Sequence, residues 1–168
     1  MLCDVYMDDI DRLRDAVYHA ELKDAEEVRS FVRNLTKLVY DYKMVGMLSD
    51  FYTPGVEYYK QNRITFSSVE DPVNYVLEFT VAFPDLRADV EHIIVKRVND
   101  EYYKVFRRLR YKGTNTGCSR FGAPTGKSLG DGCLNLSLFH LKKIGGEWKI
   151  DFEVNSDSEE LIRDTLTA

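Results

Sequence analysis

The chain has 168 residues, of which 44% are hydrophobic and 12% aromatic. This composition suits one globular domain around a single core and argues against a disordered chain. The formal net charge of −5 would repel a phosphate backbone, so we expect no nucleic-acid partner. No apolar run approaches the length of about eighteen residues needed to cross a membrane, and the start carries no basic, signal-like region. We therefore expect a cytoplasmic protein with no membrane partner.

Cysteine and histidine usage points away from disulfides and metals. Cys3, Cys118 and Cys133 are an odd number without close spacing, so we expect reduced thiols in a reducing compartment. The three histidines, which lie in different predicted elements, are His19, His92 and His140. No metal-ligand spacing links them, and we expect no metal site and no cofactor.

The first part of the chain is predicted to be helical. Residues 4–23 carry a thin apolar stripe and predict a short amphipathic helix, so residues 1–23 form an N-terminal extension. From Asp24 to Tyr42, apolar residues recur every three or four positions and predict a long helix with a continuous apolar face. A shorter helix follows over residues 44–51, which Pro54-Gly55 should end.

The middle of the chain changes period. Val56–Gln61 is a predicted strand. Asp71-Pro72 predicts an N-cap and a first helical position, which open a helix to about Phe83. Residues 88–98 then predict a strand in which alternation breaks near His92, which indicates either a bulge or a strand buried on both faces there.

The last part is rich in strands. Its predicted elements are a strand at residues 103–112, a glycine-rich loop at Gly113–Gly132, strands at Cys133–Lys143 and Trp148–Val154 joined at Gly145-Gly146, and a short polar helix from Ser156. Helices followed by hairpin-connected strands are typical of an α+β fold in one domain. The preceding helices must cover the apolar face of the strongly curved, mixed or antiparallel sheet, which predicts a conical barrel with an interior pocket.

One segment imitates a phosphate-binding loop. Gly122–Ser128 reads Gly-Ala-Pro-Thr-Gly-Lys-Ser, with three residues between the glycines where the nucleotide-binding pattern has four. It also lies between two strands, so no helix N-terminus follows it. The segment is interpreted as a loop that reverses the chain.

The final strand carries the candidate chemistry. Period two places Ile150, Phe152 and Val154 on one face, and Asp151 and Glu153 on the other. Either carboxylate is a candidate general base if it points into the cone, and the alternative is a solvated outer face. Arg107 is placed by alternation beside apolar neighbours, so it either partners a buried carboxylate or lies at a rim or strand edge.

Three segments together resemble the SnoaL-like polyketide cyclases within the nuclear transport factor 2-like, cystatin-like superfamily. They are Ala82–Leu86 (Ala-Phe-Pro-Asp-Leu), Gly113–Gly117 (Gly-Thr-Asn-Thr-Gly) and Pro124–Lys127 (Pro-Thr-Gly-Lys). The resemblance covers about residues 24–155, and we expect the whole domain to span residues 24–168. It implies a conical α+β barrel, dimerisation through the outer sheet face, and a pocket for cofactor-free aldol cyclisation.

The resemblance also implies roles for individual residues. Glu153 matches the position of the family's acid/base aspartate, and Asp151 matches the histidine beside it. Phe139 lies near the position of a second histidine, which the cyclases carry in the preceding strand.

The leading hypothesis for function is a cofactor-independent acid/base enzyme, of cyclase or isomerase type, acting on a small, largely apolar carbonyl compound. Glu153, or Asp151 as the second choice, would abstract a proton, and Tyr58, Tyr75, Arg107 and Tyr111 are the candidates for stabilising the enolate or binding the substrate. The alternative is a non-catalytic ligand-binding or dimerisation module of the same fold. A pocket filled by Tyr and Phe side chains, with Glu153 facing bulk solvent, would favour this alternative. A pocket under about 300 Å³ would be too small for a substrate of polyketide size.

Overall fold

The computed structural model describes residues 2–60, 63–64, 68–131, 133–157 and 159–167. Met1, Gln61, Gly132 and Ala168, which end several of the predicted segments, lie outside the described residues. Within the described residues the elements are α1 (Leu2–Tyr18), α2 (Ala25–Tyr40), the 3-10 turn η1 (Val45–Met47), α3 (Leu48–Phe51), β1 (Tyr52–Lys60), β2 (Arg63–Ile64), α4 (Glu70–Ala82), β3 (Arg87–Asn99), β4 (Tyr102–Lys112), β5 (Leu134–Ile144), β6 (Glu147–Asp157) and α5 (Glu159–Thr167).

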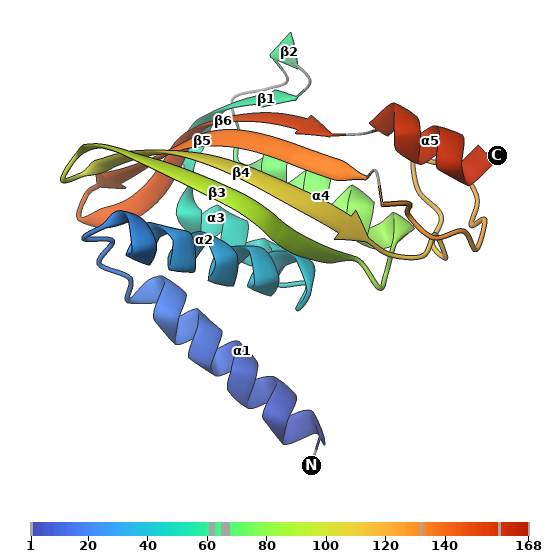
Figure 1. Cartoon of the computed structure of the whole chain (residues 1–168), viewed down its shortest axis with the longest axis horizontal. Coiled ribbons are helices and arrows are strands. Elements are labelled where there is room, and N and C mark those ends of the chain that lie inside the picture. Colours follow the sequence, from blue (N-terminus) through green and yellow to red (C-terminus); the bar gives the residue numbers. More distant parts are fainter. Residues whose placement is uncertain (1, 61–62, 65–67, 132, 158, 168) are drawn as a thin grey trace.

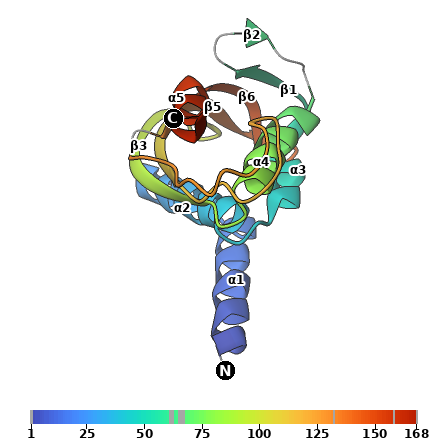
Figure 2. The same cartoon turned by 90° about the vertical axis from the view of Figure 1, so that its right-hand side faces the viewer.

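The strands form one mixed, curved sheet in the order β2-β1-β6-β5-β4-β3. β3, β4, β5 and β6 are joined as antiparallel neighbours, whereas β1 runs parallel to β6. Helices α2, α3 and α4 lie inside the curve, and α5 lies at the end of the molecule that carries the C-terminus (Figure 1). Seen along its length, the sheet wraps around the helices without closing (Figure 2). The predicted α+β cone is confirmed.

Helix α2 forms the floor of the cone. The Asp24 carboxylate caps its N-terminus by accepting hydrogen bonds from the backbone N–H groups of Glu26 (2.8 Å) and Glu27 (2.9 Å). Its buried side chains are Val28, Phe31, Val32, Leu35, Thr36, Leu38, Val39 and Tyr40. This set follows the three- and four-residue steps read from the sequence, because one face of the helix packs against the sheet.

Helix α1 projects from the body of the protein at its N-terminal end (Figure 2). Ile10, Leu13 and Val17 are buried, whereas Val5 is 68% exposed. Midway along the helix, the Asp9 carboxylate accepts hydrogen bonds from Lys37 and Tyr42. The thin apolar stripe of the sequence is therefore the surface that holds α1 on the rest of the domain.

The predicted helix over residues 44–51 ends at Phe51 as expected, but two local predictions are wrong. The strand that follows begins at Tyr52 and not at Val56, so Pro54-Gly55 lies inside β1, in the stretch between Tyr52 and Glu57 where pairing with β6 shifts register. Because this stretch is irregular, proline needs to donate no ladder hydrogen bond there. Asp71 is not an N-cap: α4 begins at Glu70, so Asp71 and Pro72 lie in its first turn.

A bulge in β6 changes which residues of the final strand lie on the same face of the sheet. Leu141 pairs with Ile150 and His140 pairs with Phe152, which leaves Asp151 as an extra residue on β6. Ile150 and Glu153 are consequently both buried, and Phe152 stacks on His140 with ring centroids 4.5 Å apart. The expected grouping of Ile150 with Phe152 and Val154 is wrong because a bulge shifts the alternation by one residue. The predicted bulge near His92 is confirmed by the register shift between Val90 and His92.

No helix among the described residues is both long and apolar enough to span a membrane.

Candidate functional site

An internal cavity lies between the helices and the concave face of the sheet. Its lining comprises Phe31, Val32, Leu35, Thr36, Val39, Tyr40, Leu48, Tyr52, Tyr58, Pro72, Tyr75, Val76, Arg107, Phe139, Ile150, Glu153 and Asn155. The cavity has a volume of about 30 Å³. One buried water needs about 10–15 Å³ on this kind of measure, so the space accommodates about two water molecules.

Glu153 is the acidic group of this cavity. Its side chain is 2% exposed, and the Tyr52 hydroxyl donates a hydrogen bond to its Oε2 atom. The Nδ2 atom of Asn155 lies 3.4 Å from Oε1 and donates a second, longer hydrogen bond. Tyr52 comes from β1 and Asn155 from β6, so two neighbouring parallel strands hold the carboxyl in place.

Arg107, from β4, brings a positive charge to the same wall. Its Nη2 atom lies 3.8 Å from Glu153 Oε1, and its side chain is 11% exposed. Its Nε donates to Ser137 Oγ (3.2 Å) and its Nη1 to Thr36 Oγ1 (3.1 Å). The guanidinium is thus fixed by two hydroxyl groups and faces the carboxyl, in keeping with the buried-carboxylate interpretation of Arg107.

Burial dominates the proton affinity of the carboxyl. Loss of hydration raises the pKa of Glu153 above its ordinary value, although the positive charge of Arg107 and the hydrogen bond from Tyr52 oppose this shift. Burial also raises the pKa of Tyr52 well above the usual range, and the Glu153 charge adds to it. Tyr52 therefore remains a hydrogen-bond donor at neutral pH, and Glu153 is the group of this pair that can exchange a proton.

The structure separates the two predicted carboxylates. Asp151 lies on the outer face of β6, where its Oδ2 pairs with Lys142 Nζ at 2.6 Å. It is the bulged residue, so its side chain points away from the cavity that Glu153 enters. Asp151 is therefore not positioned to act on a ligand in this cavity.

Most of the other predicted residues gather around Glu153. Tyr58, Tyr75, Arg107 and Phe139 line the cavity, and Phe139 is the cross-strand partner of Glu153. Tyr111 lies behind the lining and donates from its hydroxyl to the Tyr40 hydroxyl at 3.2 Å. Tyr111 therefore contacts lining residues such as Tyr40 but does not itself line the cavity.

Tyr52 and Asn155 were not recognised from the sequence. Tyr52 follows the helical pattern of residues 44–51 and precedes Pro54-Gly55, so no strand signal marks it. Asn155, in contrast, is two residues from Glu153 in the same strand, and period two places it on the same face. That spacing was the available signal for Asn155.

Among the residues that the structure describes, no group of three or more histidine, cysteine or acidic side chains is placed to hold a metal ion. Cys133 is buried, and burial raises the pKa of its thiol to about 12, so the thiol remains protonated.

No protein-family model matches the chain, and no curated protein matches its sequence. Solved structures do match. AclR from Streptomyces galilaeus, a candidate hydroxylase, has a TM-score of 0.65 and 17% identity, over 86% of this chain and 98% of that one. A candidate SnoaL-like polyketide cyclase from Jannaschia sp. CCS1 has a TM-score of 0.58 and 15% identity, over 82% and 91%. The hexachlorocyclohexane dehydrochlorinase LinA-type3 from Novosphingobium barchaimii has a TM-score of 0.58 and 13% identity, over 89% and 90%.

These similarities define the class of fold. The matched structures include SnoaL-like polyketide cyclases and nuclear transport factor 2-like proteins described as having a cystatin-like fold. The chain has this cystatin-like, nuclear transport factor 2-like fold, and the resemblance read from its sequence is confirmed at the level of the fold.

Proposed function

We propose that the protein is a cofactor-independent acid/base enzyme that acts on a compact, largely apolar carbonyl compound. The observation that carries this proposal is the Glu153 carboxyl, 2% exposed, on the wall of an otherwise largely apolar and aromatic cavity. A buried carboxyl with a raised pKa is suited to take up and return a proton near neutral pH. The similar structures carry names of several different activities, so they support an enzyme of this fold without fixing the reaction.

The proposed step is proton abstraction next to a carbonyl group. Glu153 takes the proton from the carbon, and the electron pair of the broken C–H bond moves toward the carbonyl oxygen. The Arg107 guanidinium, held by Ser137 and Thr36, stabilises the negative charge that develops on that oxygen. Glu153 then returns the proton to a carbon of the enolate, so no oxidant or cofactor enters the balance.

Cavity size limits the substrate. Sites for drug-sized ligands have volumes of about 300–1,000 Å³, far above the cavity of about 30 Å³. Side chains of the aromatic lining, such as Phe31 and Tyr58, would have to move before a ligand reaches Glu153. We therefore favour a compact substrate over one of polyketide size.

Hydrogen–deuterium exchange tests the proposal without knowledge of the natural substrate. A panel of small ketones and aldehydes is incubated with the protein in D₂O, and deuterium uptake next to the carbonyl is followed by NMR. We expect catalysed exchange for at least one compound and its loss, by about 100-fold or more, in Glu153→Gln. Asp151→Asn, which removes a carboxylate from the outer face of the same strand, is the matched control and should retain exchange. Equal exchange by wild type and Glu153→Gln would overturn the proposal.

The same cavity volume favours a second candidate, a non-catalytic binding or dimerisation module. Side chains of Tyr and Phe nearly fill the space, and Glu153 already has donors in Tyr52 and Asn155. On this reading Glu153 is a structural polar group. The panel distinguishes the two, because a binding module would show ligand-induced thermal stabilisation without any exchange.

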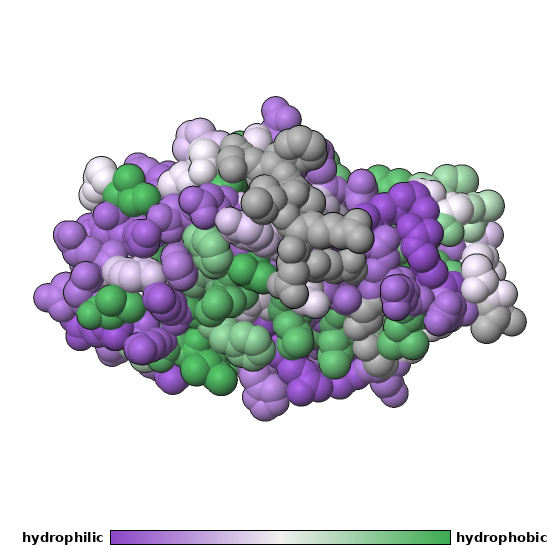
Figure 3. Space-filling view, turned by 90° about the horizontal axis from the view of Figure 1, so that it is seen from above, coloured by the Kyte–Doolittle hydropathy of each residue, from purple (hydrophilic) through white to green (hydrophobic). Residues whose placement is uncertain are grey.

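We also propose that two copies of the chain pair through the outer face of the sheet. An apolar row crosses this face, since Ile94 pairs with Phe106, Phe106 with Leu138, and Leu138 with Val154. Ile94 is 62% exposed and Leu138 40% exposed. Figure 3 looks onto the molecule from the side of β1, β5 and β6 and shows hydrophobic side chains gathered near its centre. A row of this kind on a sheet face favours burial against a partner surface.

A further inference from the structure

A chain of polar side chains connects Glu153 to the C-terminal helix. Asn155 Nδ2 donates to Glu153 Oε1, and Asn155 Oδ1 accepts from Asn135 Nδ2 at 2.6 Å. The same Asn135 Nδ2 lies 3.3 Å from the Tyr75 hydroxyl oxygen, and that hydroxyl donates to Asp157 Oδ2 at 2.9 Å. Asn135 and Asn155 are buried, so these contacts form in a region largely without competing water.

The donor and acceptor of each hydrogen bond in this chain follow from the hydrogen bond at Asp157, which lies at the end farthest from Glu153. The Tyr75 hydroxyl donates to Asp157 Oδ2 and offers its oxygen to the Asn135 amide nitrogen. The Asn135 amide then presents its N–H₂ group to the Asn155 carbonyl. Asn155 is left with its own N–H₂ group toward Glu153, which is the orientation that stabilises the carboxylate.

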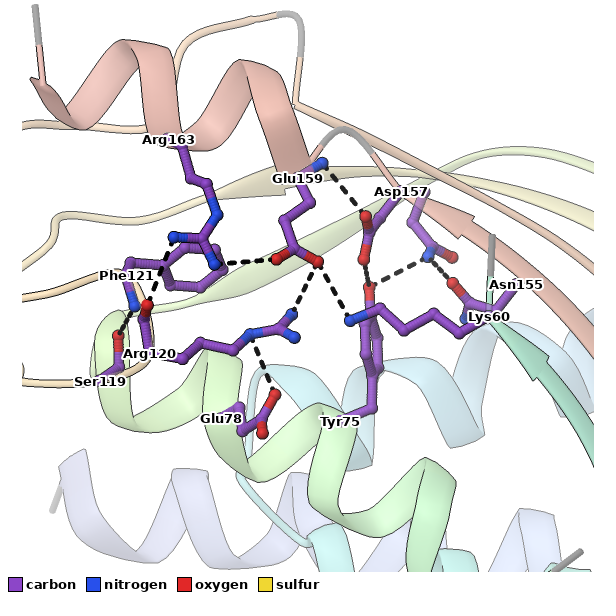
Figure 4. A network of polar contacts seen from close by, with 11 residues as sticks. Lys60, Tyr75, Glu78, Ser119, Arg120, Phe121, Asn155, Asp157, Glu159 and Arg163 are labelled. Carbon is purple, nitrogen blue, oxygen red and sulfur yellow. Dashed lines mark hydrogen bonds and ion pairs between the residues drawn. The ribbon is translucent and has the colours of Figure 1, made fainter. Parts of the chain in front are cut away.

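Asp157 also holds the start of helix α5. Its Oδ1 accepts from the backbone N–H of Glu159, the first residue of α5, at 3.1 Å. The Asp157 carboxylate thus accepts hydrogen bonds both from the start of α5 and from the chain of polar side chains that leads to Glu153. Figure 4 shows the outer part of this chain, from Asp157 to Asn155.

Glu159 anchors α5 by its charge. Its carboxylate lies 3.2 Å from Lys60 Nζ on β1, 3.4 Å from Arg120 Nη2 in the glycine-rich loop, and 3.1 Å from Arg163 Nη2 on α5 (Figure 4). Glu159 and Lys60 are only 18% and 17% exposed. Burial alone would raise the pKa of Glu159, but the three cations together lower it below its ordinary value, so the anchor stays charged at neutral pH. Ile162 and Leu166 of α5 are buried beneath it.

We propose that Asp157 is a positioning residue: seated by α5, it orients Asn155 toward Glu153 through Tyr75 and Asn135. The proposal rests on the function proposed for Glu153. The ion pairs that Glu159 makes at the start of α5 then help to set the proton affinity of the Glu153 carboxyl. Release of α5 would let Asp157 turn, free the Tyr75 hydroxyl to reorient, and remove the directed donor from Glu153.

The test measures the Glu153 carboxyl itself. Its pKa is followed from the ¹³C chemical shift of the labelled side-chain carboxyl, assigned by its absence in Glu153→Gln. Tyr75→Phe leaves every charge in place but interrupts the chain, and we expect the Glu153 pKa to rise by about half a unit or more, a threefold change in proton affinity. Tyr103→Phe, which removes another buried hydroxyl that donates to the Leu22 carbonyl, is the control for lost stability and should leave the pKa within about 0.2 unit.

A surface variant makes the same test without altering the core. Glu159→Gln should raise hydrogen exchange of the α5 amides by about tenfold and shift the Glu153 pKa upward, whereas Glu160→Gln on the exposed side of the same helix should do neither. An unchanged Glu153 pKa in both Tyr75→Phe and Glu159→Gln would overturn the proposal. These readouts need no substrate, so the proposal can fail while Glu153 still proves catalytic in the exchange assay, and the reverse also holds.

Discussion

Glu153 and Arg107 occupy one wall of a small cavity and are largely shielded from solvent, so each depends on the other for its charge. Their nearest atoms are 3.8 Å apart, and the hydroxyl groups of Tyr52, Ser137 and Thr36 and the amide of Asn155 supply further polar contacts. A buried ion pair of this kind is costly to break, because removal of one partner leaves the other charge without compensation.

Removal of the guanidinium should therefore be severe. We expect Arg107→Met to lower the free energy of unfolding by about 3 kcal/mol or more, measured by urea denaturation. Arg108→Met is the matched control. Arg108 pairs with Glu91 on the more exposed outer side, and its loss should cost about 1 kcal/mol or less. Equal costs for the two variants would contradict the placement of Arg107 in the cavity.

The raised pKa of Glu153 has a defined consequence for stability. A carboxyl whose pKa is higher in the folded than in the unfolded state stabilises the fold fully below the unfolded value of about 4.3, and this stabilisation is lost as pH rises through the folded pKa. The free energy of unfolding of the wild type, minus that of Glu153→Gln, should decrease over this window by at most about 1.4 kcal/mol per pH unit. Urea titrations at a series of pH values measure it, and a difference that grows with pH would show that the folded pKa is lowered instead.

At the scale of elements, strong periodicity made most of the fold predictable. The helix from Asp24 onward and the hairpins of β3 to β6 follow from apolar steps that a single buried face imposes. Pro54-Gly55 misled because a proline can lie in an irregular stretch of a strand as well as after a helix.

The face on which Glu153 lies could not be derived from alternation alone. Ile150, Phe152 and Val154 alternate cleanly with polar residues, so nothing in the sequence marks an extra residue in this strand. The bulge at Asp151 is fixed by pairing with His140 and Leu141 of β5, which is tertiary information. Tyr52 was missed for a similar reason, since only its pairing with Ile150 places it beside the carboxyl.

Helix α1 gives a prediction at this scale. Leu13 is 3% exposed where α1 packs on the domain, so Leu13→Ala should lower the free energy of unfolding by about 2–3 kcal/mol. Val5→Ala changes the same helix at a position that is 68% exposed and should cost less than about 0.5 kcal/mol. Thermal unfolding of the two variants measures the difference. If Leu13→Ala unfolds like wild type, α1 does not pack on the domain in solution.

At the scale of the whole molecule, the curved sheet has two faces with different tasks. Its concave face carries Arg107, Phe139 and Glu153 toward the cavity, whereas its outer face carries the row from Ile94 to Val154. Because successive side chains of a strand point to opposite faces, alternate residues of β4, β5 and β6 build the two faces, with the bulge at Asp151 as the interruption.

The proposed dimer can be tested on that row. We expect native mass spectrometry or light scattering at about 20 μM to show a dimer for the wild type, because this concentration exceeds the micromolar upper end of dissociation constants for interfaces of standard size. Leu138→Lys should shift the population to monomer, because it places a charge in the centre of the row. Leu77→Lys, at a similarly exposed position on α4, should remain dimeric. A wild type that is strictly monomeric would contradict the proposal.

The most direct test of the account is the pKa of Glu153 in the wild-type protein, measured by ¹³C NMR titration of the labelled carboxyl. The structure predicts a value clearly above the ordinary glutamate pKa of about 4.3, because burial in the cavity outweighs the charge of Arg107. A value at or below the ordinary one would mean that the carboxyl is solvated or fully neutralised by Arg107. Glu153 would then lack the proton affinity on which the proposed acid/base chemistry depends.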